Sequence, residues 1–256
     1  MLRKPSPQKL TVIALLSALF VAGLGLLTAP EAWAQSLNID LGGEGGSATG
    51  RMIQIIILIT ILSLAPGILV MVTSFTRIIV VLSFLRSAMG VQQTPPNQVL
   101  ISLALFLTAF IMAPVFQEAY EEAVLPLIDE TITEEQALRR AGEPFHAFML
   151  DHTRPKDVNL FAEMVPDLEM EGPEDIPFRV LIPAFMISEL KRAFEIGFLL
   201  FVPFVIIDML VASVLMSMGM MMLPPVMISL PFKLIFFVLV DGWAMIASSL
   251  VRSYGV

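Results

Sequence analysis

The chain has 256 residues, of which 57% are hydrophobic and 15% are charged, and its formal net charge is −8. This composition is too apolar for an ordinary soluble domain and predicts an all-α membrane protein. Because the sequence contains no cysteine, disulfides and thiolate chemistry are excluded, and no basic patch offers nucleic acid a surface to bind. We also find no pattern that predicts a cofactor or a metal site.

The beginning of the chain has the pattern of a secretory signal peptide. Basic residues precede an apolar run over 10–27, and a small-x-small triplet follows from Ala32 to Ala34. We therefore predict a signal peptide over 1–34 that is cleaved after Ala34, and the alternative is an uncleaved membrane anchor. The glycine-rich stretch that follows predicts a flexible linker over 35–51.

Further apolar stretches are long enough to cross a hydrocarbon core, which needs about 20 residues. The loop after the first is basic and the region after the second is acidic, which puts the acidic region outside the cytoplasm. Many prolines lie in or beside these stretches, where they bend helices and free backbone groups that lipid cannot satisfy. We therefore predict kinked helical hairpins over 52–116 and 181–256, with a small acidic helical domain over 117–180 on the periplasmic side. The stretches themselves lie at 52–72, 99–116, 193–215 and 226–250.

The acidic helical domain is expected to carry subunit contacts. Helix-forming residues predict one helix over 119–138, and the Gly-Glu-Pro triplet at 142–144 predicts a break before a second short helix over 145–151. Phe161 is an apolar anchor of the kind that interfaces use. We expect Phe161 and the adjoining Glu189 to lie at contacts between subunits.

Charged residues lie inside the last two apolar stretches, where each needs an oppositely charged partner or contact with a water-filled cavity. If the turn between these stretches is centred between Met220 and Met221, Asp208 and Lys233 lie at equal distances from it. Equal offsets mean equal depth in an antiparallel hairpin, at about 1.5 Å per residue. We predict that Asp208 and Lys233 form an intramembrane ion pair that locks the hairpin, and a proton relay is the alternative.

Two intramembrane aspartates also raise the possibility of another class of membrane protein. An intramembrane aspartyl protease needs two aspartates that share a proton, but Asp241 lies on the order of 12 Å from Asp208 in depth. No phosphate-binding loop or nucleophile elbow occurs in the sequence. We therefore expect no enzymatic activity, and the protease and an ion- or proton-conducting membrane protein remain the alternatives.

The turn between the last two apolar stretches has an unusual composition, MSMGMMMLPP over 216–225. Methionine is unbranched and polarizable, so clustered methionines can repack around different partners. In a symmetric ring they could close a pore and still yield to varied polypeptides. The alternative is an ordinary apolar turn.

Four segments of the chain carry distinctive motifs, which are SFTRI at 74–78, QQTPP at 92–96, PAFMISELKRAFEIGF at 183–198, and the methionine-rich turn that leads to LPFK at 230–233. These motifs resemble those of the FliP family of type III export proteins, and the resemblance covers nearly all of 51–254. The signal peptide and the methionine-rich turn favour flagellar rather than injectisome use.

The resemblance implies a core, pore-forming subunit of the flagellar export gate, which conducts unfolded flagellar proteins across the inner membrane. It implies a multi-pass protein in a homo-oligomeric ring of five copies at the basal body, assembled with FliQ and FliR and with FlhB and FlhA alongside. It also implies that Met220, Met221 and Met222 form a pore gasket. The family's intramembrane charge pair maps onto Asp208 and Lys233.

Overall fold

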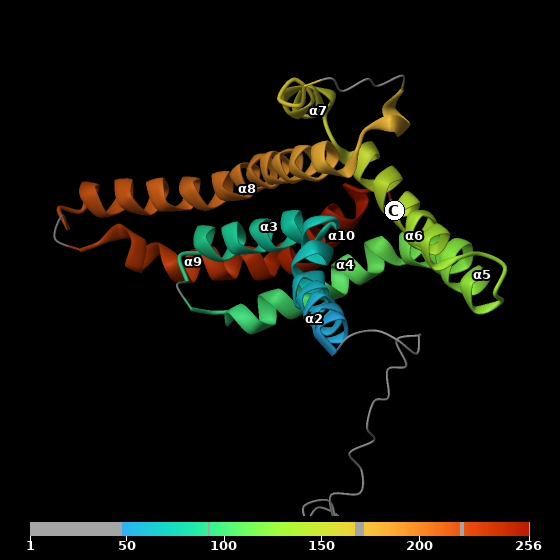
Figure 1. The fold of residues 1–256 in the computed structure, drawn as a ribbon. Coiled ribbons are helices and arrows are strands. Elements are labelled where there is room, and N and C mark those ends of the chain that lie inside the picture. Colours follow the sequence, from blue (N-terminus) through green and yellow to red (C-terminus); the bar gives the residue numbers. More distant parts are fainter. Residues whose placement is uncertain (1–47, 92, 167–171, 221–222, 256) are drawn as a thin grey trace, which may run out of the picture. The chain divides into compact units, whose positions relative to one another are not determined.

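Helices form every element in the part of the chain that the structure describes. The predicted signal peptide over 1–34 and nearly all of the predicted linker over 35–51 lie outside that part. The computed structural model describes residues 48–91, 93–166, 172–220 and 223–255 (Figure 1).

The chain separates into two units, 1–58 and 59–256, and the fold described below is that of the second unit. Helix α2 begins in the first unit and ends in the second. In chain order the elements are α2 (Ala48–Met71), α3 (Phe75–Ala88), α4 (Asn97–Ala119), the π-helical turn η1 (Tyr120–Val124), α5 (Leu125–Ile128), α6 (Glu134–His152), α7 (Pro155–Ala162), the 3-10 turn η2 (Pro173–Asp175), α8 (Phe178–Ser217), α9 (Pro225–Leu239) and α10 (Gly242–Arg252).

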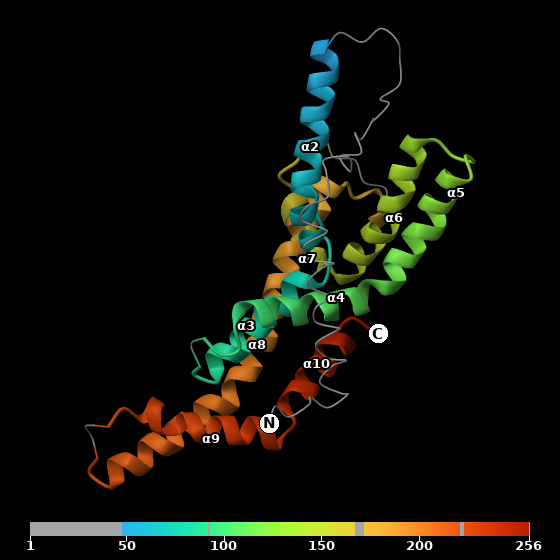
Figure 2. The same ribbon diagram turned by 90° about the horizontal axis from the view of Figure 1, so that it is seen from below.

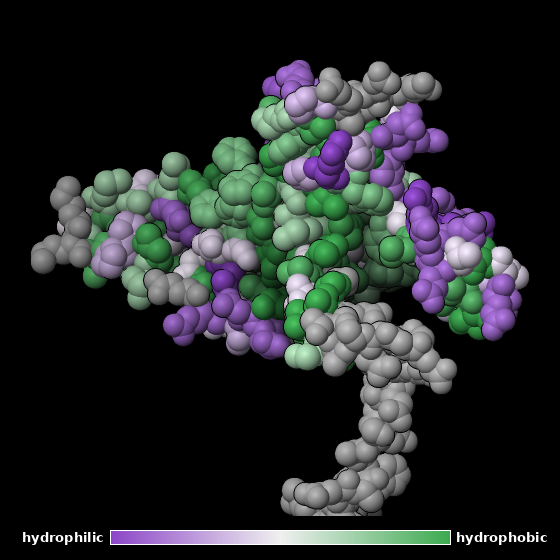
Figure 3. Space-filling view, in the orientation of Figure 1, coloured by the Kyte–Doolittle hydropathy of each residue, from purple (hydrophilic) through white to green (hydrophobic). Residues whose placement is uncertain are grey.

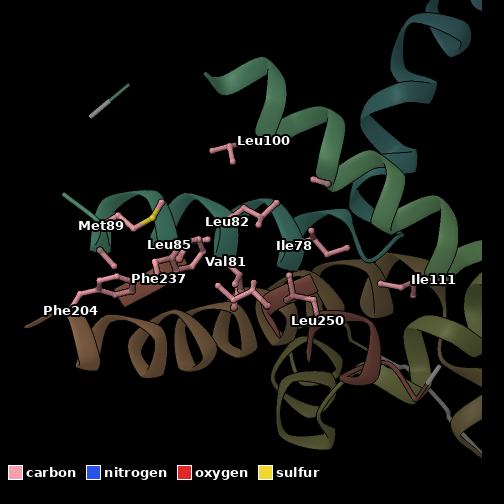
Figure 4. Close-up of a cluster of buried hydrophobic side chains, with 14 of the residues drawn as sticks. Ile78, Val81, Leu82, Leu85, Met89, Leu100, Ile111, Phe204, Phe237 and Leu250 are labelled. Atoms are coloured by element: carbon pink, nitrogen blue, oxygen red, sulfur yellow. The ribbon is translucent and has the colours of Figure 1, made fainter. Parts of the chain in front are cut away.

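Helix α3 holds the hairpins together because one of its faces is apolar at helical spacing. Ile78, Val81 and Leu85 recur every three or four residues and are fully buried. They belong to one cluster with Phe237 of α9 and Leu250 of α10, which we call the hairpin core (Figure 4). This packing removes the apolar face of α3 from its surroundings and brings the two predicted hairpins into contact.

Helices α8 and α9 lie antiparallel and form a hairpin in both views (Figures 1 and 2). Helix α8 has 40 residues, so it is about 60 Å long, roughly twice the thickness of a hydrocarbon core. Its first turns bury Leu181 and Phe185 in a second cluster with Met149 of α6 and Val158 of α7, which we call the domain core. Only part of α8 can therefore lie within a bilayer, and its beginning belongs to the acidic helical domain.

Two helical stretches in the described residues, Asn97–Ile128 and Phe178–Ser217, are long and apolar enough to cross a membrane. Helices α9 and α10 make a third if the bent pair is counted as one span. Hydrophobic side chains gather over α8, whereas hydrophilic ones gather over α5, α6 and α7 (Figure 3). The predicted fold class, an all-α membrane protein, is confirmed.

The axis bends by 61° between α9 and α10. Asp241 has a left-handed φ of 50° at the bend, and Gly242 begins α10. A Cβ atom at Gly242 would lie 2.2 Å from the ring of Phe237, so a larger residue would push that ring out of the hairpin core. The bend therefore depends on glycine at this position.

The predicted helix boundaries in the acidic helical domain are wrong. The expected helix over 119–138 is interrupted by a turn in which Glu130 has φ 54°, and α6 starts only after Thr133. Thr133 and Gln136 form a capping box, in which each side chain accepts a hydrogen bond from the other residue's backbone N–H. Helix α6 then continues through the buried Pro144, because packing on that face compensates for the backbone hydrogen bond that proline removes.

Candidate functional site

Asp208 of α8 and Lys233 of α9 face each other across the hairpin. Lys233 Nζ donates a hydrogen bond to Asp208 Oδ2 at 2.6 Å. The hydroxyl of Ser229, one turn earlier on α9, donates to the other oxygen of the same carboxylate. The two residues whose equal spacing from the turn predicts a pair are therefore in contact, and Asp208 receives two donors from one face of α9.

Lys233 also contacts helix α3. Its Nζ lies 3.3 Å from the carbonyl oxygen of Ala88, the last residue of that helix. The last carbonyls of a helix have no partner within it, and a cation near them interacts favourably with the helix dipole. Lys233 thus joins α3, α8 and α9. Neither Ser229 nor Ala88 could be found from the sequence, because no spacing rule relates them to Asp208 or Lys233.

Helix α8 ends in a glycine-dependent turn. Gly219 has φ +74°, its N–H donates to the Met216 carbonyl, and the N–H of Met220 donates to the Leu215 carbonyl. This pair of hydrogen bonds is the Schellman motif, which stops a helix at a residue in the left-handed conformation. The chain direction therefore reverses at a fixed place, directly before the remaining methionines.

The methionines of this turn that the structure describes are exposed. The side chains of Met216 and Met218 project from the end of α8, and Met220 is 44% exposed. Met221 and Met222 lie outside the described residues. Of the predicted gasket, the structure describes Met220 alone, at the tip of the hairpin that the Asp208 and Lys233 contact holds together.

Glu189 lies inside the chain rather than on its surface. Its carboxylate is 0% exposed and accepts two hydrogen bonds from the guanidinium of Arg77, one of them from Nε at 3.0 Å. The Tyr254 hydroxyl donates to the same carboxylate. The expectation that Glu189 contacts a neighbouring subunit is therefore wrong, because an enclosed side chain has no surface to offer. A buried carboxylate needs internal partners, and the available signal was Arg77, a charge in the basic segment between the first two apolar stretches.

A second polar cluster links helix α7 to α8 through hydrogen bonds. The Asp157 carboxylate accepts hydrogen bonds from the Ser188 hydroxyl and from Arg154 Nε, the latter at 2.9 Å. Burial alone would raise the pKa of Asp157, but these hydrogen bonds and the charges of Arg154 and Lys191 outweigh it, so the pKa lies below its usual value. Asp157 therefore stays ionised and keeps α7 on α8.

Phe161 lies on α7, where its ring is half-buried beside the domain core. The exposed part of the ring leaves room for a partner, and a subunit contact at Phe161 stays a prediction.

Comparison with known proteins identifies the family. A model of the FliP family matches residues 58–250 of the chain. The chain belongs to the FliP family. It is 54% identical to the flagellar biosynthetic protein FliP of Caulobacter vibrioides over 94% of this chain and 90% of the relative. It is 57% identical to the protein of that name from Bacillus subtilis, over 79% and 91% of the two chains, and 50% identical to that of Aquifex aeolicus, over 90% and 96%.

The range that the FliP family model matches contains Arg77, Glu189, Asp208 and Lys233. Tyr254, which closes the cluster around Glu189, lies beyond it. Ser253, which accepts a hydrogen bond from Arg77, lies beyond it too, so the family model does not reach two residues that contact the buried ion pair.

The geometry of this FliP family chain favours an ion pair over an aspartate dyad. An aspartyl protease needs two aspartates that share a proton, but both carboxylate oxygens of Asp208 accept hydrogen bonds from α9. Asp241 is exposed at the start of α10. Within the residues that the structure describes, no group of three or more His, Asp or Glu side chains is placed to hold a metal ion.

Proposed function

We propose that this chain is a core, pore-forming subunit of the flagellar type III export gate, which conducts unfolded flagellar proteins across the inner membrane at the flagellar basal body. Membership of the FliP family supports the proposal, and the relatives are named as flagellar biosynthetic proteins. The long apolar helices support a place in a membrane. Nothing in the proposed role requires the chain to change a covalent bond.

The proposed assembly is a homo-oligomeric ring, pentameric as the resemblance implies, that combines with FliQ and FliR and works beside FlhB and FlhA. Large apolar side chains remain exposed on α4, α8 and α9, among them Phe106, Phe198 and Leu239. Such surfaces need lipid or protein to cover them. Prolines inside these helices leave backbone carbonyls that lipid cannot satisfy, which favours protein neighbours over part of the surface. These prolines are Pro114, Pro183, Pro203 and Pro231.

The observation that carries the proposed mechanism is the exposed methionine turn at the tip of a locked hairpin. The contact between Asp208 and Lys233 fixes α8 against α9, and the Schellman motif at Gly219 fixes where the chain reverses. Copies of Met220, Met221 and Met222 around a ring would then meet at the channel axis. Unbranched thioether side chains change rotamer easily, so this gasket could hold back ions and still part for an unfolded chain.

Replacing all three gasket methionines with alanine tests the mechanism. Each copy in the ring loses side-chain volume, so ion conductance through the assembled complex in a planar bilayer should rise. Assembly should persist, because the turn is not expected to supply the affinity between subunits. The matched control is Met245→Ala, an exposed methionine on α10 away from the turn, which should leave conductance at the parent value. A triple variant that assembles and stays as tight as the parent would show that these residues are only an apolar turn.

Copurification tests the proposed partners. A detergent extract of cells that express the tagged chain should yield FliQ and FliR together with several copies of the chain itself. Recovery of a lone monomer that has protease activity or carries ions by itself would support the other classes of membrane protein instead.

A further inference from the structure

Two residues that follow α10 complete the buried cluster around Arg77 and Glu189. Arg77 Nη1 donates to the Ser253 hydroxyl at 3.0 Å and lies 3.4 Å from the Ser253 carbonyl oxygen. The guanidinium carbon of Arg77 lies 3.8 Å from the centre of the Tyr254 ring, within the range of a cation–π contact. Besides Glu189, Arg77 therefore contacts Ser253 and Tyr254, which both belong to the segment after α10.

The ring of Tyr254 also contacts the acidic helical domain. It stacks on Phe148 of α6, with 5.9 Å between ring centres and 17° between planes, and lies 4.9 Å from the ring of His152. Phe148 and His152 stack on each other at 4.7 Å. Tyr254 thus contacts α3, α6 and α8 from the end of α10, and it is itself buried.

The hydroxyl and the ring of Tyr254 make different contacts. The hydroxyl donates to Glu189 and so holds the end of α10 to α8. The ring packs on Phe148 and His152 and so holds the end of α10 to α6. A buried ion pair is stable only while its remaining hydrogen-bonding groups are satisfied, so movement of α10 away from this site would weaken the pair between Arg77 and Glu189.

We propose that Tyr254 is a positioning residue, a latch that fixes the second hairpin and the acidic helical domain to each other through α10. Gly242 lies at the beginning of α10 and Tyr254 follows its last residue, so the contacts of Tyr254 hold α10 at the end away from the bend. The proposal concerns contacts within one chain and does not rest on the proposed export function.

Amide hydrogen exchange of the full chain, purified in detergent as its assembled complex, tests the latch. Tyr254→Ala removes both sets of contacts, so exchange should speed up about tenfold or more in both Gly242–Arg252 and Glu134–His152. Tyr254→Phe removes only the hydroxyl, so exchange should rise in α10 and stay at the parent rate in α6. The matched control is Tyr120→Ala, which truncates the only other tyrosine of the chain, an exposed one in η1, and should leave α10 unchanged.

The two variants keep the proposal open to refutation even if one of them folds poorly. Parent rates in α10 for Tyr254→Phe would show that the hydroxyl holds nothing and would overturn the latch. Faster exchange in α10 alone for Tyr254→Ala would break the link to α6 and overturn it as well. If Tyr254→Ala does not fold, Tyr254→Phe decides by itself, because faster exchange confined to α10 supports the latch and equal acceleration in every helix contradicts it.

Discussion

The contact between Asp208 and Lys233 makes an asymmetric prediction about stability. Asp208→Ala leaves the ammonium of Lys233, whose side chain is 5% exposed, with only the Ala88 carbonyl as a partner. Lys233→Met leaves the carboxylate of Asp208, whose side chain is 30% exposed, with the Ser229 hydroxyl and access to its surroundings. Leaving the more deeply buried charge without its partner should lower the free energy of unfolding more. Asp208→Ala should therefore be less stable than Lys233→Met.

The magnitudes follow from the burial of each partner. Removing one member of a buried pair costs about 3–5 kcal/mol, and we expect Asp208→Ala to fall within that range. Lys233→Met should cost about 2 kcal/mol, because the partly exposed Asp208 keeps a donor and loses less on being left alone. The double variant removes both charges, so its cost should be smaller than the sum of the single costs by at least about 1 kcal/mol.

The assay is unfolding of the detergent-purified chain by added sodium dodecyl sulfate, followed by circular dichroism, for the parent, the two single variants and the double variant. Asp208→Asn is the matched control for shape, because it keeps an oxygen for the Ser229 hydroxyl and removes the charge. Single costs that add up in the double variant would refute the pairing. A larger loss for Lys233→Met than for Asp208→Ala would refute the argument from burial.

Three further outcomes are expected. Phe161→Ala should weaken ring assembly on native gels before it lowers the helix content of the single chain, and unchanged assembly would count against a contact there. The pKa of Asp157 in the folded chain lies below the unfolded value of 3.8. The ionised carboxylate therefore stabilises the fold above pH 3.8, and this stabilisation is lost as the pH falls through the folded pKa. Asp157→Asn should remove this part of an acid-unfolding profile. Gly242→Ala should lower thermal stability by displacing Phe237, and a parent melting temperature would show that the bend tolerates a side chain.

Local rules of depth and spacing predicted the contact in the second hairpin. The pairing of Asp208 with Lys233 needed only the helical rise and the position of the turn, since an antiparallel hairpin relates residues through one centre. The apolar stretch over 193–215 falls within α8, but the sequence did not show that this helix begins at Phe178. Its early turns are helical because they pack in the domain core, and that packing cannot be read from an apolar run.

The same rules cannot predict contacts between segments that lie far apart in the sequence. Glu189 was expected at a subunit contact because it adjoins the acidic helical domain, yet its partner Arg77 lies 112 positions earlier and its partner Tyr254 lies 65 positions later. No periodicity relates positions that far apart. The predicted helix break at Pro144 is wrong for a different reason, because tertiary packing of α6 outweighs the local preference of proline for a helix end.

The most direct test of the central claim, that the methionine turn lines an export channel, uses the absence of cysteine from the parent chain. Met220→Cys puts a single thiol at the tip of the hairpin, and Met245→Cys puts a single thiol on the exposed side of α10 as a control. A charged methanethiosulfonate reagent is added to the assembled complex in a planar bilayer while ion conductance is recorded. The account predicts that conductance changes for Met220→Cys and stays constant for the parent and for Met245→Cys. If the reagent is shown by mass spectrometry to have modified Met220→Cys and conductance does not change, residue 220 does not line the channel and the account is contradicted.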